Sequence, residues 1–290
     1  FGTDTAPSVG DLVSNVTFKD GYIFFNASEL KGNAVIAVEN RDEDILWSWH
    51  IWMTDQPADQ IYKNGAGTVM DRNLGATSAT KGDAGALGLM YQWGRKDPFL
   101  GGHSISYSST AIQAKAKSTI TWPSGVSSDS SNGTIDYVIK HPTTFVKYNS
   151  SNYDWYYTGG SSTDNTRWNS AKGIYDPCPK GWRVPDGGSN GLWSTALGSS
   201  SSFAGPWDNS NRGVDFTGEF SASPEVWYPA SAYLDYFSGT LFLVGSRGYY
   251  WSCTPTGRYA YRLSTSNDGR ITPSSNYSRA DGSSVRCVKQ

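Results

Sequence analysis

The sequence predicts a fold of short strands joined by long, turn-rich loops, with few and short helices. Aromatic residues make up 14% of the 290 residues, including 12 Trp and 18 Tyr, and aromatic residues favour strands. Glu, Lys and Leu, which favour helices, are comparatively few. Gly, Ser, Asn and Thr fill long stretches, and these residue types favour turns and loops.

Residues 1–45 are predicted to form a β-rich segment. VSNVTFKDGYIFFN (13–26) alternates apolar and polar residues around a Lys-Asp-Gly turn, which indicates a hairpin. NAVIAVEN (33–40) is a further short strand. About three strands cannot bury a core of their own. We therefore interpret 1–45 as the end of a β-sandwich, or as an arm packed on a main domain that spans 46–290.

The main domain begins with a strand, ILWSWHIWMTD (45–55), whose alternate residues give one aromatic face. Leu192, Trp193, Ala196 and Leu197 have helical spacing, and Gly198 is expected to end that helix. The other expected elements, in chain order, are a strand or turn at 68–76, a short helix or strand at 85–99 that ends in a turn, a helix at 108–118 within an otherwise loop-like 101–170, a loop at 199–238, and three closing strands at 249–255, 258–266 and 283–290.

Charge and hydropathy exclude two classes of partner. The net charge is −2 and no basic run of five or more residues occurs, so the sequence has no nucleic-acid footprint. The longest apolar runs fall far short of the roughly 20 residues that a membrane span requires. No charged segment followed by an apolar stretch opens the chain, so we expect any signal peptide to be absent from this sequence.

Cys178, within YDPCPKGWRVP (175–185), has three possible roles: nucleophile, metal ligand or half of a disulfide. A zinc site needs four ligands at fixed geometry, and the three His and three Cys show no such spacing. A nucleophilic Cys needs a His as base, and none is indicated. A disulfide to Cys287 is therefore favoured; it would close a loop of about 109 residues, worth roughly 4.7 kcal/mol. Cys253 is then expected to be a buried free thiol.

Two enzymatic patterns are weak. Gly187 to Gly191 matches the G-x-S-x-G elbow, but all three His precede Ser189, the wrong order for that motif. Glu219 and Glu225 lie in an aromatic loop region and could form a glycosidase pair, although any chain of this length offers such pairs. We assign no catalytic residue, no metal ligand and no cofactor.

Aromatic residues in polar loops are the more informative set. Rings beside short polar groups suit sugar or protein surfaces, because they offer contact area with little entropy to lose. The alternative is that these rings anchor the loops to the core. The candidate ligand-binding residues are Trp155, Tyr156, Trp168, Trp207, Trp227, Tyr228, Tyr233 and Tyr236.

Six motifs occur in an order that resembles the Fibrobacter-succinogenes-type major paralogous domain, which is common in fimbrillin-like surface lipoproteins of Bacteroidetes. They are DRNLGA (71–76), GLMYQWGRKDPF (88–99), YDPCPKGWRVP (175–185), GYYWSCTP (248–255), AYRL (260–263) and GSSVRCVK (282–289). The likeness covers roughly residues 45–290. ILWSWHIWMTD resembles the segment that opens such a domain after a fimbrillin-type β-sandwich.

The resemblance implies a compact α+β, C-type-lectin-like fold with few short helices, short antiparallel strands and long loops on one side, preceded by the short β segment. That fold is also similar to the formylglycine-generating enzymes. The copper-binding Cys pair of those enzymes and the calcium motifs of the lectins have no counterpart here, so neither activity carries over. The position of Cys253 is more often Ser in the family, which fits an unpaired thiol.

The expected function is that of a non-enzymatic adhesion module at the bacterial cell surface, anchored to the outer membrane or carried on a fimbrial tip. It is expected to bind a glycan, or a host or bacterial surface protein, through the aromatic loops. A structural pilus subunit, whose N-terminal strands pair with a neighbouring fimbrial subunit, is the alternative. A carbohydrate-active enzyme is a third hypothesis and would need a pocket with coupled titratable groups.

Overall fold

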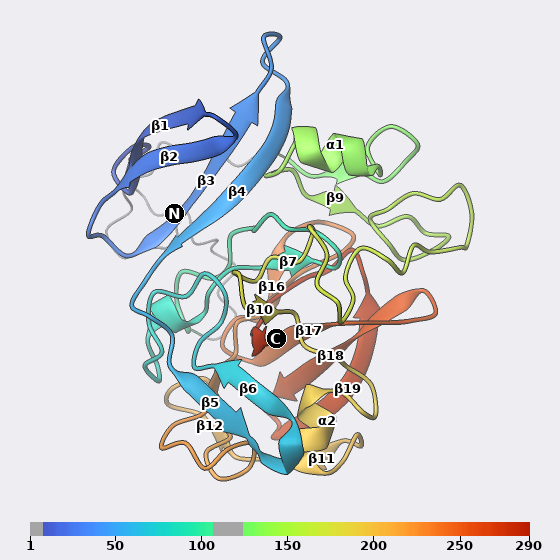
Figure 1. Cartoon of the computed structure of the whole chain (residues 1–290). Coiled ribbons are helices and arrows are strands. Elements are labelled where there is room, and N and C mark those ends of the chain that lie inside the picture. Colours follow the sequence, from blue (N-terminus) through green and yellow to red (C-terminus); the bar gives the residue numbers. More distant parts are fainter. Residues whose placement is uncertain (1–7, 107–123) are drawn as a thin grey trace.

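The computed structural model describes residues 8–106 and 124–290 and is β-rich (Figure 1). Strands account for 37% and helices for 7%, and within the described residues no helical layer covers a sheet, so the expected α+β, C-type-lectin-like class is wrong. The two α-helices have six residues each and lie at different ends of the molecule. The helical segments are α1 (Ile135–Lys140), α2 (Leu192–Leu197), and the 3-10 turns η1 (Lys63–Gly65) and η2 (Ala84–Ala86).

The largest sheet is antiparallel and is formed late in the chain. Its strands β17 (Arg247–Thr256) and β18 (Tyr259–Ser266) are joined by a two-residue turn in which Gly257 has a positive φ of 54°, a conformation that glycine adopts at little cost. In strand order the sheet consists of β11 (Phe203–Ala204), β19 (Arg270–Ser278), β18 and β17.

Strand β19 is missing from the sequence prediction, which placed the third closing strand at 283–290. Its sequence, RITPSSNYS, contains Pro273, and proline normally argues against a central strand. The register between β18 and β19 shifts between Arg262 and Ser264, and Pro273 falls at that irregularity. A bulge accommodates the proline there. Residues 282–289 instead contain two strands of two residues, Gly282–Ser283 and Val288–Lys289, which belong to other sheets.

Three smaller sheets surround the largest one. One brings both ends of the main segment together, with β10 (Trp182–Arg183), β21 (Val288–Lys289), β6 (Gly67–Met70) and β5 (Asp59–Tyr62) in that order. The second has three strands in the order β12 (Trp207–Asp208), β13 (Gly213–Asp215) and β14 (Trp227–Pro229). The third has four strands in the order β16 (Leu241–Phe242), β15 (Tyr233–Leu234), β20 (Gly282–Ser283) and β7 (Tyr91–Gln92). A parallel pair, β8 (Val126–Ser127) with β9 (Val146–Lys147), lies near α1.

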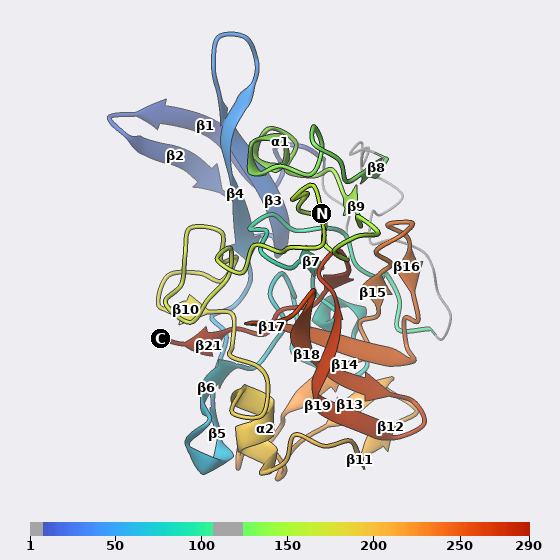
Figure 2. The same ribbon diagram turned by 90° about the vertical axis from the view of Figure 1, so that its right-hand side faces the viewer.

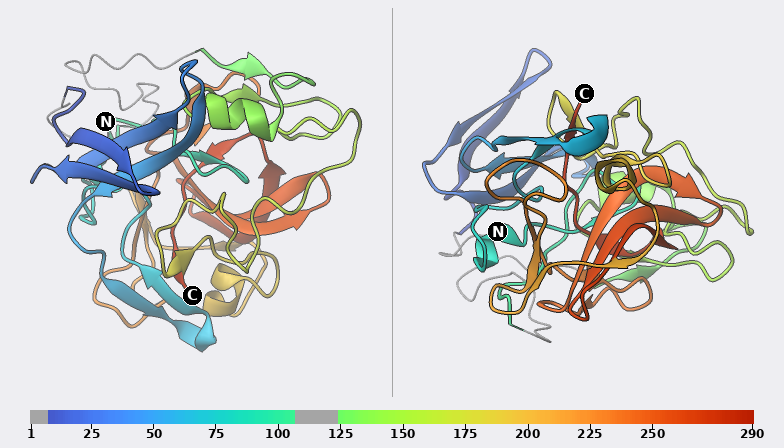
Figure 3. Two further views of the ribbon diagram at one scale, coloured as in Figure 1. Left: turned by 45° about the horizontal axis from the view of Figure 1, so that its top comes forward. Right: turned by 90° about the horizontal axis from the view of Figure 1, so that it is seen from below.

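The predicted N-terminal hairpin is present as β1 (Val13–Lys19) and β2 (Tyr22–Ala27). Figures 2 and 3 show that it projects away from the rest of the protein. The next two strands, β3 (Gly32–Glu39) and β4 (Ile45–Met53), pair with each other along their length. The boundary expected at residue 45 therefore falls at the turn of a second hairpin.

The core contains large aromatic residues from distant parts of the sequence. Trp93, Trp168 and Trp251 share one buried cluster with both disulfide cysteines, and a second cluster joins Trp193 of α2 to the sheet of β12–β14. Helix α2 matches its prediction, because Gly198 ends it in the left-handed conformation at φ 71°.

One observed helix was not predicted, and one predicted helix is untested. Helix α1 was not expected, although Thr134 caps it by accepting a hydrogen bond from the Tyr137 backbone N–H. The helix expected at 108–118 lies outside the described residues. Among the described residues, no helix is long and apolar enough to cross a membrane.

Candidate functional site

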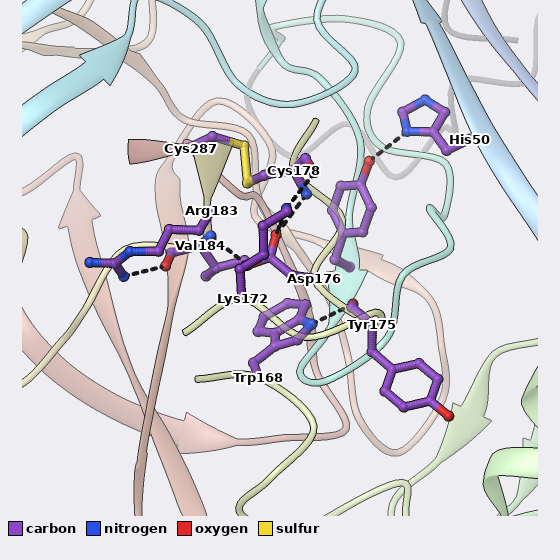
Figure 4. The surroundings of a disulfide bond; sticks show 10 residues. His50, Trp168, Lys172, Tyr175, Asp176, Cys178, Arg183, Val184 and Cys287 are labelled. Carbon is purple, nitrogen blue, oxygen red and sulfur yellow. Dashed lines mark hydrogen bonds and ion pairs between the residues drawn. A yellow bond between two sulfur atoms is a disulfide. The ribbon is translucent and has the colours of Figure 1, made fainter. Parts of the chain in front are cut away.

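The YDPCPKGWRVP segment is a structural anchor (Figure 4). Cys178 and Cys287 form the predicted disulfide, and Cys253 is a buried free thiol, as predicted. Asp176 fixes the segment, since its carboxylate accepts the backbone N–H groups of Cys178 and Val184, both at 2.9 Å. The disulfide therefore ties the strand β10 region to the last strand of the chain.

Half of the sequence-predicted aromatic residues are buried. Trp155 and Trp168 are fully buried, and each indole N–H donates to a backbone carbonyl at 2.8 Å. The Tyr228 hydroxyl is bonded to that of Tyr62 at 2.7 Å. Trp227 is 2% exposed. These rings hold loops and strands onto the core, which was the alternative role for them.

The other four predicted residues, Tyr156, Trp207, Tyr233 and Tyr236, are half-buried. Tyr156 packs against Trp155, and the Trp207 indole N–H donates to Asn209 Oδ1 at 3.1 Å. Tyr233 and Tyr236 belong to a larger surface array of rings, which the structure assembles from five separate segments. This array is the candidate binding surface.

We call this surface the aromatic strip. Its rings come from the segment after β9, from β15 and β16 with their connecting turn, and from β17, β18 and β19. Three rings are clearly exposed: Phe237 at 66%, Phe242 at 43% and Tyr277 at 39%. The complete strip consists of Tyr148, Tyr153, Tyr233, Tyr236, Phe237, Phe242, Tyr249, Tyr259 and Tyr277.

Ring contacts connect most of the strip. Tyr148 is its centre, with its ring centroid 4.8 Å from that of Tyr236 in an edge-on arrangement, and 5.9 Å from that of Tyr153. Tyr236 in turn contacts Tyr277 at 6.1 Å. A second group places Tyr233 5.3 Å from Tyr249. Tilted and edge-on pairs of this kind favour one relative orientation, so the rings are held in place before any ligand arrives.

Backbone hydrogen bonds fix the loops that carry the strip. The Tyr148 N–H donates to the Tyr236 carbonyl at 2.9 Å, which joins the two loops directly. The Tyr153 carbonyl accepts from the Ser278 hydroxyl at 2.7 Å and from the Arg279 N–H at 3.0 Å. The loop after β9 is therefore attached to the end of β19.

Arg262 is buried beside the strip and packs against one ring from each of the two groups. Its guanidinium carbon lies 3.9 Å from the Tyr249 ring centroid and 4.3 Å from that of Tyr277. Asp281 pairs with Arg262 and also accepts the Tyr236 N–H at 3.0 Å. Burial raises the pKa of Asp281 to about 7, against the lowering effect of Arg262.

Tyr233, Tyr236 and Tyr277 present neutral phenols. Burial is the main cause that raises the pKa of Tyr233, Tyr236 and Tyr277 above the usual value, and neighbouring acidic groups add to it. Among the described residues, none forms a hydrogen bond with these three hydroxyls. Each hydroxyl can therefore donate to and accept from a ligand.

Two of the nine strip residues, Tyr233 and Tyr236, are among the candidate site residues predicted from the sequence. Tyr249, Tyr259 and Tyr277 join the strip through the pairing of β17, β18 and β19, and Tyr153 joins it through its ring contact with Tyr259 at 5.5 Å. The alternation of RYAYRLSTS was a usable signal, but the position of Tyr277 depended on the unpredicted strand β19.

Within residues 8–106 and 124–290, no group of three or more His, Cys, Asp or Glu residues is arranged to hold a metal ion. Comparison of the chain with protein-family models, with curated proteins and with solved structures found no match.

Proposed function

We propose that this chain is a non-enzymatic binding module that contacts a glycan or a surface protein through the aromatic strip. The observation that carries the proposal is the array of pre-oriented rings with three exposed members, Phe237, Phe242 and Tyr277. Isolated exposed apolar residues need no explanation, whereas a contiguous group of them marks an interaction surface.

The chemistry of the strip suits such a ligand. Tyrosine rings bury a large area while losing few rotatable bonds, and their hydroxyls bond to polar groups. The Arg258 guanidinium lies 5.0 Å from the Tyr153 ring centroid and is exposed, so it adds a cationic donor at one end. Sugar rings and protein surfaces both present the mixture of C–H and hydroxyl or amide groups that this surface complements.

An extracellular location, at the bacterial cell surface or on a fimbrial tip, is part of the proposal. The Cys178–Cys287 disulfide supports it, because disulfides persist in oxidising compartments and are rare in the cytosol. The order of the six motifs that resemble the major paralogous domain of Bacteroidetes surface lipoproteins supports it as well.

The test is a binding screen of the wild-type chain on a glycan array and on immobilised host matrix proteins. The strip variant carries Tyr236→Ala, Phe237→Ala and Tyr277→Ala, and the matched control carries Phe18→Ala, Tyr22→Ala and Phe24→Ala on hairpin β1–β2. We expect the strip variant to bind at least tenfold more weakly and the control to bind like the wild type.

A wild-type chain that binds nothing on either surface contradicts the proposal. Equal binding by the strip variant contradicts it too. Release of shorter glycans from a bound ligand, detected by mass spectrometry, would instead favour the enzymatic hypothesis.

A structural subunit is the second candidate, and the exposed hairpin favours it. Phe18, Tyr22 and Phe24 are 60%, 68% and 54% exposed, and β1 and β2 pair only with each other among the described strands. Both outer edges are open to strand addition. Concentration-dependent self-association in sedimentation experiments, lost in the hairpin control variant, would support this candidate over adhesion.

A further inference from the structure

A pocket lies beside the aromatic strip, between the parallel pair β8–β9 and the hairpin β15–β16. In Figure 2, β8 and β9 lie above this hairpin. The volume of the pocket is about 350 Å³, within the roughly 300 to 1,000 Å³ of pockets that bury small ligands. Its base is apolar and its rim is polar. The residues of the base, each at most 5% exposed, are Phe99, Leu100, Phe145 and Leu234.

Two glycines bring the chain close to Phe145 in this pocket. A Cβ atom at Gly125 would lie 3.2 Å from the Phe145 carbonyl oxygen, and one at Gly239 would lie 3.0 Å from the Phe145 ring. Gly239 also has a φ of 72°, a conformation that favours glycine. Both positions therefore leave the pocket without a side chain that would fill it.

One charged residue lies on the rim, and we call the site the Lys147 pocket. The Lys147 side chain extends along Gly125, because a Cβ atom at Gly125 would lie 3.4 Å from Lys147 Cε. Lys147 is half-buried, and no described residue accepts a hydrogen bond from its ammonium group or forms an ion pair with it. A cation in such a position attracts an anionic group. The other polar side chains of the rim are Ser124, Thr143 and Ser238.

No carboxylate competes for Lys147 among the described residues that line the pocket, since none of them is Asp or Glu. The carboxylate of Asp235 is used within the turn between β15 and β16. Its Oδ1 accepts the backbone N–H groups of Phe237 and Ser238 at 3.1 and 2.9 Å. The Lys147 pocket therefore favours an anionic ligand over a cation.

Hydroxyl groups accompany the cation on the rim. Ser124 is exposed and Thr143 is half-buried, and neither hydroxyl bonds to a described residue. Each hydroxyl can both donate and accept a hydrogen bond, so the rim suits a ligand that itself carries several hydroxyl groups. One anionic group among several hydroxyls is the pattern of an acidic sugar. An acidic peptide side chain has the charge and lacks the hydroxyls.

The Lys147 pocket adjoins the aromatic strip along the chain. Lys147 directly precedes Tyr148 of the strip, and Phe237 of the strip directly precedes Ser238 of the rim. The Tyr148 N–H donates to the Tyr236 carbonyl at 2.9 Å, which holds the two segments together. A glycan with one unit in the pocket can therefore continue over Phe237, which is 66% exposed.

We propose that the Lys147 pocket binds an acidic sugar unit, whose carboxylate or sulfate group pairs with the Lys147 ammonium group and whose hydroxyls bond to Ser124 and Thr143. The volume corresponds to about twelve water molecules at about 30 Å³ each, which gives room for one sugar ring with its acidic group. This inference rests on the glycan-binding function proposed above and narrows the ligand to an acidic glycan.

The experiment compares sugars that differ in charge by ligand-observed NMR titration of the complete chain in a buffer without phosphate. Methyl β-D-glucuronide is paired with methyl β-D-glucoside, and N-acetyl-D-glucosamine 6-sulfate with N-acetyl-D-glucosamine. We expect at least one acidic sugar to bind with a Kd on the order of 1 to 10 mM, at least threefold more tightly than its neutral counterpart. The pair with the larger preference identifies carboxylate or sulfate as the anionic group. Raising NaCl from about 50 to about 500 mM should reduce the preference.

Lys147→Met removes the charge at similar side-chain length and is expected to bind each acidic sugar no more tightly than its neutral counterpart. Lys147→Arg restores the charge and should restore the preference. Lys19→Met on hairpin β1–β2 changes the net charge by the same amount and is the matched control, which should keep the preference of the wild type. Urea unfolding of the three variants confirms that each is folded.

Equal binding of both acidic sugars and their neutral counterparts to the wild type overturns the inference, and so does an unchanged preference in Lys147→Met. Sodium acetate or a capped glutamate peptide that binds as tightly as the acidic sugars overturns it too, because charge alone would then explain the binding.

The strip variant (Tyr236→Ala, Phe237→Ala, Tyr277→Ala) separates this inference from the proposed function. It is expected to keep the preference for the acidic monosaccharide, and loss of that preference overturns the assignment to the Lys147 pocket. A glycan that binds through the strip while the wild type shows no preference for either acidic monosaccharide leaves the proposed function standing and overturns this inference alone.

Discussion

Arg262 and Asp281 form a buried ion pair beneath the aromatic strip, with 3.1 Å between Nη1 and Oδ2. Replacement by Arg262→Met leaves the Asp281 carboxylate without its cationic partner. We expect the free energy of unfolding to fall by about 3 kcal/mol at pH 8, since breaking a buried pair exposes the desolvation cost of the remaining charge. Urea unfolding measures this loss.

Arg270→Met on the exposed end of β19 is the matched control and should change the free energy of unfolding by less than about 0.5 kcal/mol. If Arg262→Met costs no more than this control, the pair has no part in holding the strip.

The stability of the folded protein should also depend on pH through Asp281. Burial raises its pKa to about 7, against about 3.9 in the unfolded chain. The folded state therefore binds more protons between these values, so this group's contribution is fully present below about pH 4 and lost as pH rises through 7. Asp281→Asn does not titrate. The free energy of unfolding of the wild type, relative to this variant, should decrease between about pH 4 and 8. If the free energy of unfolding of the wild type, relative to the variant, instead increases with pH, folding lowers the pKa of Asp281 and the prediction is wrong.

The disulfide should contribute several kcal/mol to stability. It closes a loop with a sequence separation of 109 residues, for which the chain-entropy model gives about 4.7 kcal/mol and measured values are typically 2 to 5. Cys178→Ser, Cys287→Ser and the double variant should lose similar amounts in urea unfolding, because each removes the same bond. Losses that add in the double variant would mean that the two sulfurs act separately.

Cys253 should be unreactive in the folded protein. Burial, with Asp186 nearby, raises its pKa to about 12, so the reactive thiolate is scarce at pH 8. A colorimetric thiol reagent should find no thiol in the native chain, one in denaturant and three after reduction. Rapid labelling of the native protein would contradict the buried position.

Several elements of the fold, among them strands β17 and β18 of the largest sheet, could be predicted from the sequence, and so could the disulfide. The hairpin at β1–β2, the strands β17 and β18 and the helix ended by Gly198 all follow from alternation, turn residues and a glycine cap. The Cys178–Cys287 pair followed from the absence of ligand or base spacing. Apart from the disulfide, these features depend on neighbouring residues, which a sequence displays directly.

The α+β expectation failed because it came from resemblance rather than from composition, which correctly indicated few helices. The strip could not be assembled beforehand, because Tyr277 lies on β19 and the proline in that strand is accommodated by a bulge. Trp155 and Trp168 are buried whereas Tyr236 is half-buried, although all three occur in similar polar loops. Their different positions depend on contacts between residues far apart in the sequence.

Hydrogen exchange of the wild-type chain, with and without the strongest ligand from the glycan and matrix-protein screen, tests whether the ligand binds on the aromatic strip. We expect slower exchange in peptides that cover 148–153, 233–237 and 276–279, because a ligand on the strip shields the backbone of these loops. Protection confined to hairpin β1–β2, with exchange in the three strip segments unchanged, would contradict it.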